Sequence, residues 1–187
     1  MTSRLDAAFA AVPRADFLPP SLRSLAGLDE PLPIGHGATN SQPWTVQYML
    51  RQLDVQPGDR VLDVGSGSGW TTALLGHLTG ETGAVIGVDL EPDLVAMGRD
   101  NLRGRFDWVR FELAEPGVLG WPTEAPYDRI LVSADAGRVP RELEEQLAPG
   151  GRMVLPAAQE MMVVDRSLSG EITRTPTDGR FSFVPLR

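Results

Sequence analysis

Apolar residues recur at two different periods along the chain, and the first is helical. Near the start, spacings of three and four positions between apolar residues predict a short amphipathic helix that ends at Pro13. Its apolar positions are Leu5, Ala8, Phe9 and Val12. The segment from there to Asn40 is rich in proline and glycine, so we expect an irregular cover. A second helix is predicted to begin near Ser41, with Pro43 in its first turn.

Further along, short apolar runs alternate with amphipathic segments. The runs that predict strands lie at 60–64, 84–89, 108–111, 129–133 and 152–155. Helical patterns lie between them at 70–78, 92–102 and 140–147, the last ended by Pro149-Gly150-Gly151. Such alternation predicts an α/β fold with a mostly parallel sheet and helices on both faces. Two runs near the end, 161–164 and 181–184, have no long helix between them and predict an antiparallel C-terminal hairpin at the sheet edge.

Missing residue types exclude several chemistries. The chain of 187 residues has no cysteine and, among its 17 basic residues, no lysine. Disulfides, thiolate nucleophiles, Schiff bases and phosphate-loop lysines are therefore excluded. His36 and His77 are far apart in no metal-ligand spacing, so we expect no metal. The net charge of −8 argues against nucleic acid as a partner. Since no apolar run approaches the ~20 residues of a spanning helix, we expect no membrane partner and a cytoplasmic location.

The most informative segment is the glycine-rich turn at 63–69, where a predicted strand gives way to a helix. Glycines there let the backbone turn tightly and approach a ligand, although such a turn can also be purely structural. Asp89 ends the next strand, where a carboxylate can accept both hydroxyls of a ribose, and Asp63 precedes the glycines. The Gly-x-Gly-x-Gly spacing after an acid disfavours a pyrophosphate and suits a cationic sulfonium. We infer S-adenosyl-L-methionine as the cofactor, with Asp63 facing its positive end.

The same segment resembles the first motif of the seven-strand, class I methyltransferases, and one branch of them matches much further. The pieces 12–19 and 31–43 look like the N-terminal signature of protein-L-isoaspartate O-methyltransferases, as do 124–130, 146–151 and 183–186. The Gly-x-Gly-x-Thr-x-Ser-Gln-Pro pattern that starts at Gly35 is specific to that family, and the similarity covers almost the whole chain.

The resemblance implies a Rossmann-like seven-stranded fold and methyl transfer to the α-carboxylate of an isoaspartyl residue in damaged proteins or peptides. That carboxylate, with an ordinary pKa near ~4, is ionised at neutral pH, so no general base is required. Ser41 corresponds to the family's active-site serine, while its residue type also suits a helix N-cap. By resemblance, the cofactor site comprises Asp63, Gly65, Ser66, Gly67, Gly69, Asp89, Leu90 and Glu115, and the substrate site comprises Thr39, Ser41 and Asp135.

Three positions depart from the family pattern. Pro116 stands where the family has an Asp that contacts adenine, so Glu115 is the predicted substitute; otherwise adenine binding is weaker or differently arranged. Asp135 introduces a carboxylate that we expect at the active-site mouth, where it would repel an isoaspartyl anion or select a basic neighbour. Asn40 replaces an apolar residue just before Ser41.

Alternative functions remain open at this point. One is a carboxyl methyltransferase for a specialised peptide aspartate or a small carboxylic acid. Another, of a different class, is a non-catalytic module that binds the cofactor or a partner. A nicotinamide dehydrogenase is disfavoured by the glycine spacing. In each case we expect one monomeric domain over 1–187, with 1–56 as a helical and loop cover carrying the Ser41 loop and 57–187 as the cofactor-binding sheet.

Overall fold

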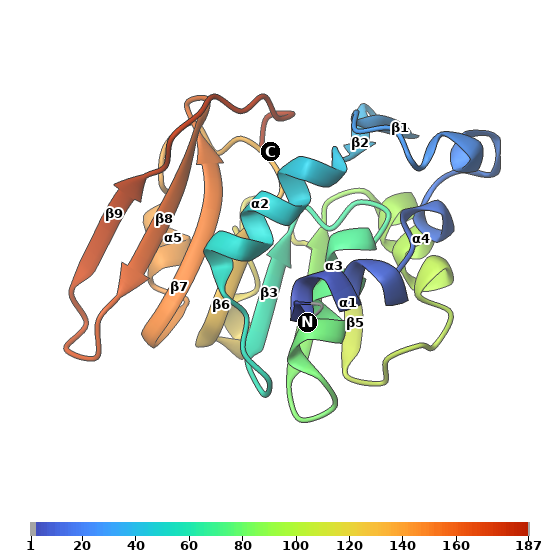
Figure 1. Cartoon of the computed structure of the whole chain (residues 1–187). Coiled ribbons are helices and arrows are strands. Elements are labelled where there is room, and N and C mark those ends of the chain that lie inside the picture. Colours follow the sequence, from blue (N-terminus) through green and yellow to red (C-terminus); the bar gives the residue numbers. More distant parts are fainter. Residues whose placement is uncertain (1–2, 187) are drawn as a thin grey trace.

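The computed structural model describes residues 3–186, and its centre is a seven-stranded sheet (Figure 1). The strands are β3 (Arg60–Val64), β4 (Ala84–Asp89), β5 (Val109–Leu113), β6 (Tyr127–Val132), β7 (Leu147–Ala157), β8 (Glu160–Arg166) and β9 (Ile172–Pro176). Their order in space is β5-β4-β3-β6-β7-β8-β9. The first five strands are parallel, and β8 and β9 are antiparallel to their neighbours. The predicted fold class is confirmed.

Alternate residues of the central strands face two separate cores. Val61 of β3 and Leu131 of β6 belong to the first core, whereas Leu62 and Ile130 belong to the second. The helices on the first face are α1 (Arg4–Ala11), α2 (Pro43–Leu53), α3 (Trp70–Thr79) and α4 (Pro92–Leu102). Among residues 3–186, the second face is covered by the short α5 (Arg141–Glu144), the 3-10 turn η3 (Pro122–Glu124) and loops. Figure 1 shows α2 crossing in front of the sheet and α5 behind it.

The C-terminal hairpin differs from the prediction. The run at 161–164 does lie in β8, but β8 pairs with β9 at 172–176 rather than with residues 181–184. Most side chains of β9 are exposed, so its polar sequence carries no apolar pattern that would reveal a strand. The segment around Val184 instead returns to the strand ends, where the Asp135 N–H donates to Val184 O at 2.8 Å and the Leu186 N–H donates to Asp135 O at 2.8 Å.

The helix predicted at 140–147 is also shorter than expected. It ends at Glu144, and β7 already begins at Leu147, so Pro149-Gly150-Gly151 lies inside a strand. A register irregularity between β6 and β7 accommodates this segment. A Cβ at Gly151 would lie 2.8 Å from Ala148 O and 3.1 Å from Tyr127 O, so the close backbone approach requires glycine there.

The N-terminal cover contains more regular structure than predicted. Two 3-10 helices, η1 (Arg14–Phe17) and η2 (Pro20–Leu25), precede a two-stranded hairpin of β1 (Leu32–Gly35) and β2 (Ala38–Asn40). The helix predicted near Ser41 begins at Pro43, after Gln42 as the N-cap residue. The first turn is capped from a distance, since the Trp44 N–H donates to Asp29 Oδ1 at 2.8 Å, so the capping role considered for Ser41 is wrong.

Candidate active site

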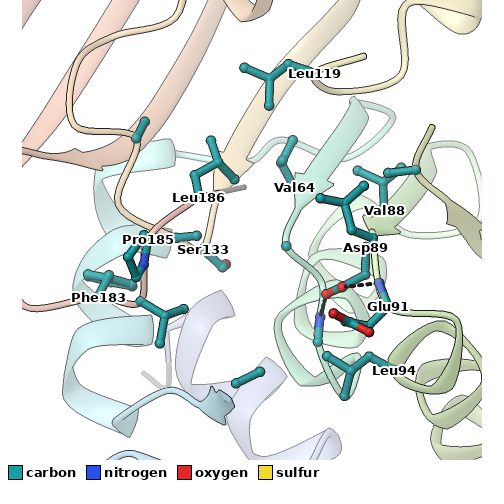
Figure 2. A pocket seen from close by; sticks show the side chains of 18 of the residues that line it. Val64, Val88, Asp89, Glu91, Leu94, Leu119, Ser133, Phe183, Pro185 and Leu186 are labelled. Atoms are coloured by element: carbon teal, nitrogen blue, oxygen red, sulfur yellow. Dashed lines mark hydrogen bonds between the residues drawn. The ribbon is translucent and has the colours of Figure 1, made fainter. Parts of the chain in front are cut away.

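A large cavity opens where the carboxyl ends of the central parallel strands meet. Strand β3 lies between β4 and β6, so the chain order reverses at β3, and open α/β sheets bind ligands in the crevice at such a point. The cavity has a volume of about 880 Å³ and is lined by the glycine loop (65–69), the β1–β2 hairpin, the start of α2, the loops after β4, β5 and β6, and the C-terminal segment. Figure 2 shows Val88, Asp89 and Leu94 facing Ser133, Pro185 and Leu186 across it.

The glycine loop forms the floor of this cavity. Gly65, Gly67 and Gly69 have φ of +78°, +52° and +88°, which glycine adopts without strain. Gly65 and Gly67 line the cavity, and the N–H groups of Gly65 and Ser66 are held by Val88 O at 2.9 and 3.0 Å. A Cβ at Gly67 would lie 3.1 Å from Ile34 Cδ1 of β1. The loop therefore offers bare backbone to a ligand, as predicted for these two glycines.

Two other predicted members of the loop lie outside the large cavity. A Cβ at Gly69 would come within 2.7 Å of the Phe111 ring, so this glycine permits close packing of α3. Ser66 is buried, and its Oγ has no hydrogen-bond partner among the described residues. A Cβ at Gly87 would lie 3.0 Å from Ser66 Cβ, so the Ser66 side chain packs beside β4. Gly69 therefore serves packing, while Ser66 borders a smaller cleft beside the cavity and its contact with the cofactor stays a prediction.

Asp89 stands at the cavity wall with its carboxylate held by backbone amides. Its Oδ2 accepts from the Gly67 N–H at 2.9 Å and its Oδ1 from the Glu91 N–H at 3.0 Å (Figure 2). A carboxylate has about four lone-pair sites, so each oxygen can accept a further hydrogen bond. Leu90 also lines the cavity, as predicted. Such a fixed carboxylate fits the vicinal hydroxyls of a ribose.

The wall beside Asp89 combines apolar surface with one more acid. Val88, Leu94 and Leu119 offer apolar side chains, which suit a flat aromatic base. Glu115 and Gly117 also line the cavity, whereas Pro116 does not. The Ala114 N–H donates to Asp89 O at 2.9 Å and so fixes this loop against the end of β4. Glu115 therefore lies at the cavity, and its contact with adenine stays a prediction.

Asp63 does not face the cavity, so its predicted contact with a cationic ligand is corrected. It lies on the same side of β3 as Val61, and its side chain is 0% exposed. The Thr72 hydroxyl donates to Asp63 Oδ2 at 2.7 Å, and the Ser133 hydroxyl donates more weakly to Oδ1 at 3.5 Å. Burial raises the pKa of Asp63 to about 7, despite the hydrogen bond from Thr72 and with a further increase from the charge of Asp89. Asp63 therefore joins β3 to α3 and to the loop after β6 through buried hydrogen bonds.

This raised pKa gives a test by pH. Between the ordinary value of 3.8 and about 7, the folded protein keeps a proton on Asp63 that the unfolded chain releases. The contribution of Asp63 to the free energy of unfolding therefore falls as pH rises through this range and is constant above it. Replacing Asp63 by Asn removes the decline, so the stability of Asp63→Asn relative to wild type should rise by a few kcal/mol from about pH 4 to about pH 7.

Urea unfolding over a pH series measures this difference. Asp100→Asn, an exposed position on α4, is the control and should track the wild type at every pH. Parallel curves for Asp63→Asn and wild type would show that Asp63 is ionised throughout the range.

Ser41 and Thr39 also line the cavity, opposite the strand ends. They come from β2 and the two residues that join it to α2, and Thr45 in the first turn of α2 extends the same wall. A smaller cleft of about 30 Å³ is bordered by Ser41, Ser133 and the glycine loop. The structure therefore brings part of the predicted set together around one cavity, namely Thr39, Ser41, Gly65, Gly67, Asp89, Leu90 and Glu115.

Asp135 is the second acid that the structure moves away from its predicted place. It is not among the residues that line the cavity. Its Oδ1 accepts from the Gly137 N–H at 2.8 Å and the Ala158 N–H at 3.1 Å, so the carboxylate is used to fix the turn after β6. The predicted repulsion of an anionic substrate by Asp135 loses its basis.

Three lining features were missed by the sequence analysis. Arg138 is the arginine among the described lining residues, while Asp89, Glu91, Glu115 and Glu142 supply negative charge. His36 lies in the turn between β1 and β2 with φ +54°. Its Nε2 lies 3.3 Å from Asp93 Oδ2 and its Nδ1 3.6 Å from Glu91 Oε2, so the β1–β2 hairpin meets the start of α4. The C-terminal residues 182–186 line the cavity, although a strand was predicted at 181–184.

Comparison with known proteins agrees with this arrangement. The family model for protein-L-isoaspartate(D-aspartate) O-methyltransferase matches residues 1–187. A protein-L-isoaspartate O-methyltransferase of Methanopyrus kandleri is 44% identical over 191 residues, covering 99% of this chain and 84% of the relative. One from Anaeromyxobacter dehalogenans is 48% identical over 169 residues, covering 87% of this chain and 79% of the relative.

Solved structures give the same result for the fold. A protein-L-isoaspartate O-methyltransferase structure matches with a TM-score of 0.86 and 25% identity, covering 100% of this chain and 62% of that one. A second, from Plasmodium falciparum and described as a putative enzyme of that name in complex with S-adenosyl-L-homocysteine, has a TM-score of 0.84 and 24% identity, covering 99% and 90%.

Proposed function

Because this chain belongs to the protein-L-isoaspartate O-methyltransferase family, we propose that it methylates the α-carboxylate of L-isoaspartyl residues in damaged proteins and peptides, with S-adenosyl-L-methionine as methyl donor. The observation that carries the proposal is structural. One cavity of about 880 Å³ is lined both by Asp89 with the bare glycine loop and by Ser41 with Thr39. A cofactor and a carboxylate substrate can therefore meet in it.

The residues present fit the cofactor. Gly65 and Gly67 leave space for it, Asp89 offers fixed acceptors for ribose hydroxyls, and Glu115 is the acid proposed to meet the adenine amino group. When bound, S-adenosyl-L-methionine supplies a methyl group on a positively charged sulfur. Because the lining residues include four carboxylates and one arginine, the cavity favours a cationic ligand over a pyrophosphate.

The chain's own residues then position the substrate. An isoaspartyl carboxylate is ionised at neutral pH, so the protein need only orient it and exclude water. Ser41 is proposed to donate a hydrogen bond to it. Arg138 adds the positive charge that an anion needs among the acids. Phe183 and Val184 form an apolar part of the wall that restricts water.

Methyl transfer to matched peptides tests the proposal. We expect the protein to label an isoaspartyl peptide and to leave its normal aspartyl twin unlabelled. Labelling of the aspartyl peptide or of a small carboxylic acid alone would favour the specialised carboxyl methyltransferase. Tight binding of S-adenosylhomocysteine without methylation of any of these would favour the non-catalytic module.

Ser41→Ala should lower kcat/KM for the isoaspartyl peptide by about 10- to 100-fold, the effect of losing a hydrogen bond to a charged group. The dissociation constant for S-adenosylhomocysteine should stay unchanged, because the serine is assigned to the substrate. Steady-state kinetics and calorimetry measure the two quantities, with Ser24→Ala on exposed η2 as control. An unaltered kcat/KM would remove Ser41 from the substrate site.

Three predictions concern the location, the oligomeric state and the division of the chain. In residues 3–186 no helix has both the length and the hydropathy to cross a membrane. A cytoplasmic location, a monomeric state and the division into a cover at 1–56 and a sheet at 57–187 stay predictions of the sequence analysis.

A further inference from the structure

One buried amide joins the two loops that define the active site. Asn40 is 4% exposed and directly precedes Ser41. Its Nδ2 donates to Ser68 Oγ at 3.2 Å, and Ser68, itself 2% exposed, lies between the last two glycines of the glycine loop. The side chain therefore spans from the proposed substrate loop to the proposed cofactor loop.

A buried arginine fixes the direction of this amide. The Arg14 Nε–H donates to Asn40 Oδ1 at 2.8 Å, so the oxygen must face Arg14 and the NH₂ group must face Ser68. Arg14 Nη2 also donates to Asn40 O at 3.0 Å, the carbonyl of the peptide bond whose N–H belongs to Ser41. The remaining N–H groups of Arg14 donate to backbone carbonyls of Ala26, Leu28 and Glu30.

The other end of the connection is tied to the cofactor wall. Ser68 follows Gly67, whose N–H is held by Asp89, and Asn101 Nδ2 of α4 donates to Ser68 O at 3.0 Å. A ligand that engages Asp89 therefore acts on a carboxylate that also fixes the glycine loop. A shift of the glycine loop would move Ser68 and, through its hydrogen bond, the side chain of Asn40. The peptide bond between Asn40 and Ser41 would then change its orientation.

We propose that Asn40 is a positioning residue that couples occupation of the cofactor site to the orientation of Ser41, through its hydrogen bond to Ser68. This inference rests on the proposed function and adds to it a dependence between the two ligands. Binding of S-adenosylhomocysteine should tighten binding of an isoaspartyl peptide, and the peptide should tighten S-adenosylhomocysteine by the same factor, because coupling of this kind is reciprocal.

Calorimetry on the full chain measures the coupling as the ratio of peptide dissociation constants without and with saturating S-adenosylhomocysteine. We expect a ratio of about 5 or more in the wild type, within the usual range for coupled sites, and a ratio near 1 in Asn40→Leu and in Ser68→Ala. Asn40→Leu leaves the buried Arg14 Nε–H without its acceptor and could fail to fold. Ser68→Ala removes only the link to the glycine loop, so it tests the coupling in that case too.

Asn40→Asp is the matched control at the same position. The carboxylate of this variant can accept from Arg14 and also from the Ser68 hydroxyl, which then donates instead of accepting. The link between the two loops is kept, so the ratio should equal that of the wild type. If Asn40 had only a structural role, Asn40→Leu would weaken binding of both the peptide and S-adenosylhomocysteine, and the ratio of peptide dissociation constants would stay as in the wild type. A wild-type ratio retained in Ser68→Ala overturns the coupling while leaving the proposed function intact. A wild-type protein that binds S-adenosylhomocysteine but no isoaspartyl peptide contradicts the proposed function, and the coupling with it.

Discussion

Replacing Asp89 by alanine is expected to weaken S-adenosylhomocysteine binding by about 1–3 kcal/mol, which is roughly a 5- to 150-fold rise in the dissociation constant. Two physical effects contribute. The proposed hydrogen bonds from ribose hydroxyls to a carboxylate are lost, and such charge-assisted bonds are stronger than neutral ones. The N–H groups of Gly67 and Glu91 also lose their acceptor, so the loop is less well arranged before the ligand arrives.

Calorimetric titration of the folded variant measures this change directly. Asp100→Ala, an exposed position on α4, is the matched control and should bind with wild-type affinity. Asp89→Asn keeps one carbonyl acceptor and should fall between alanine and the wild type. A wild-type dissociation constant in Asp89→Ala would place the ribose elsewhere and would contradict the proposed cofactor geometry.

Gly69→Ala is expected to lower the free energy of unfolding by about 2–5 kcal/mol, a large part of the stability of an ordinary domain. The backbone at Gly69 has φ +88°, which costs an alanine roughly 1–2 kcal/mol. In addition, the new Cβ would lie 2.7 Å from Phe111 Cζ and 3.0 Å from Gly98 Cα. The second contact is backbone of α4, so neither neighbour can move away without displacing a packed element.

Gly104→Ala separates these two contributions. Gly104 also has positive φ, at +67°, but a Cβ there meets nothing within 4 Å. Chemical denaturation should therefore show only the conformational cost of about 1–2 kcal/mol in this control. Equal losses in the two variants would mean that the contact between α3, α4 and Phe111 adjusts freely, against the tight packing derived for the glycine loop.

The arrangement of helices and strands was largely readable from local pattern. The runs at 60–64 and 84–89 have the observed strand bounds, and the helix at 92–102 has the observed bounds as well. These elements bury regular apolar faces, so their periodicity reports their structure. Strand β9 could not be found this way because it lies at the sheet edge with mostly exposed side chains, so no apolar alternation marks it although it forms a hairpin with β8.

The candidate site was predictable in part. Four of the predicted residues line the cavity: Ser41, Gly65, Gly67 and Asp89. They could be predicted because each lies at the end of a strand or in the turn after it, where the local sequence pattern is informative. Asp63 and Asp135 do not line the cavity. Asp63 is covered by Thr72 on one side of the sheet, and Asp135 is held by the backbone amides of Gly137 and Ala158, and both arrangements depend on how distant segments pack. Arg138 lies in the loop after β6, and the C-terminal residues 182–186 reach the cavity through the return of the chain, where Asp135 pairs with Val184 and Leu186.

The amino-acid sequence by itself determined the family, the glycine turn at 63–69 and the alternation of strands and helices from β3 to β6, because each is carried by residues close together along the chain. Only the tertiary structure decided which acids meet a ligand and which are enclosed, and that Asn40 contacts Ser68 across 28 positions. The reason is that side-chain direction in a strand alternates at every residue, so a face becomes inside or outside only when the partners that cover it have packed.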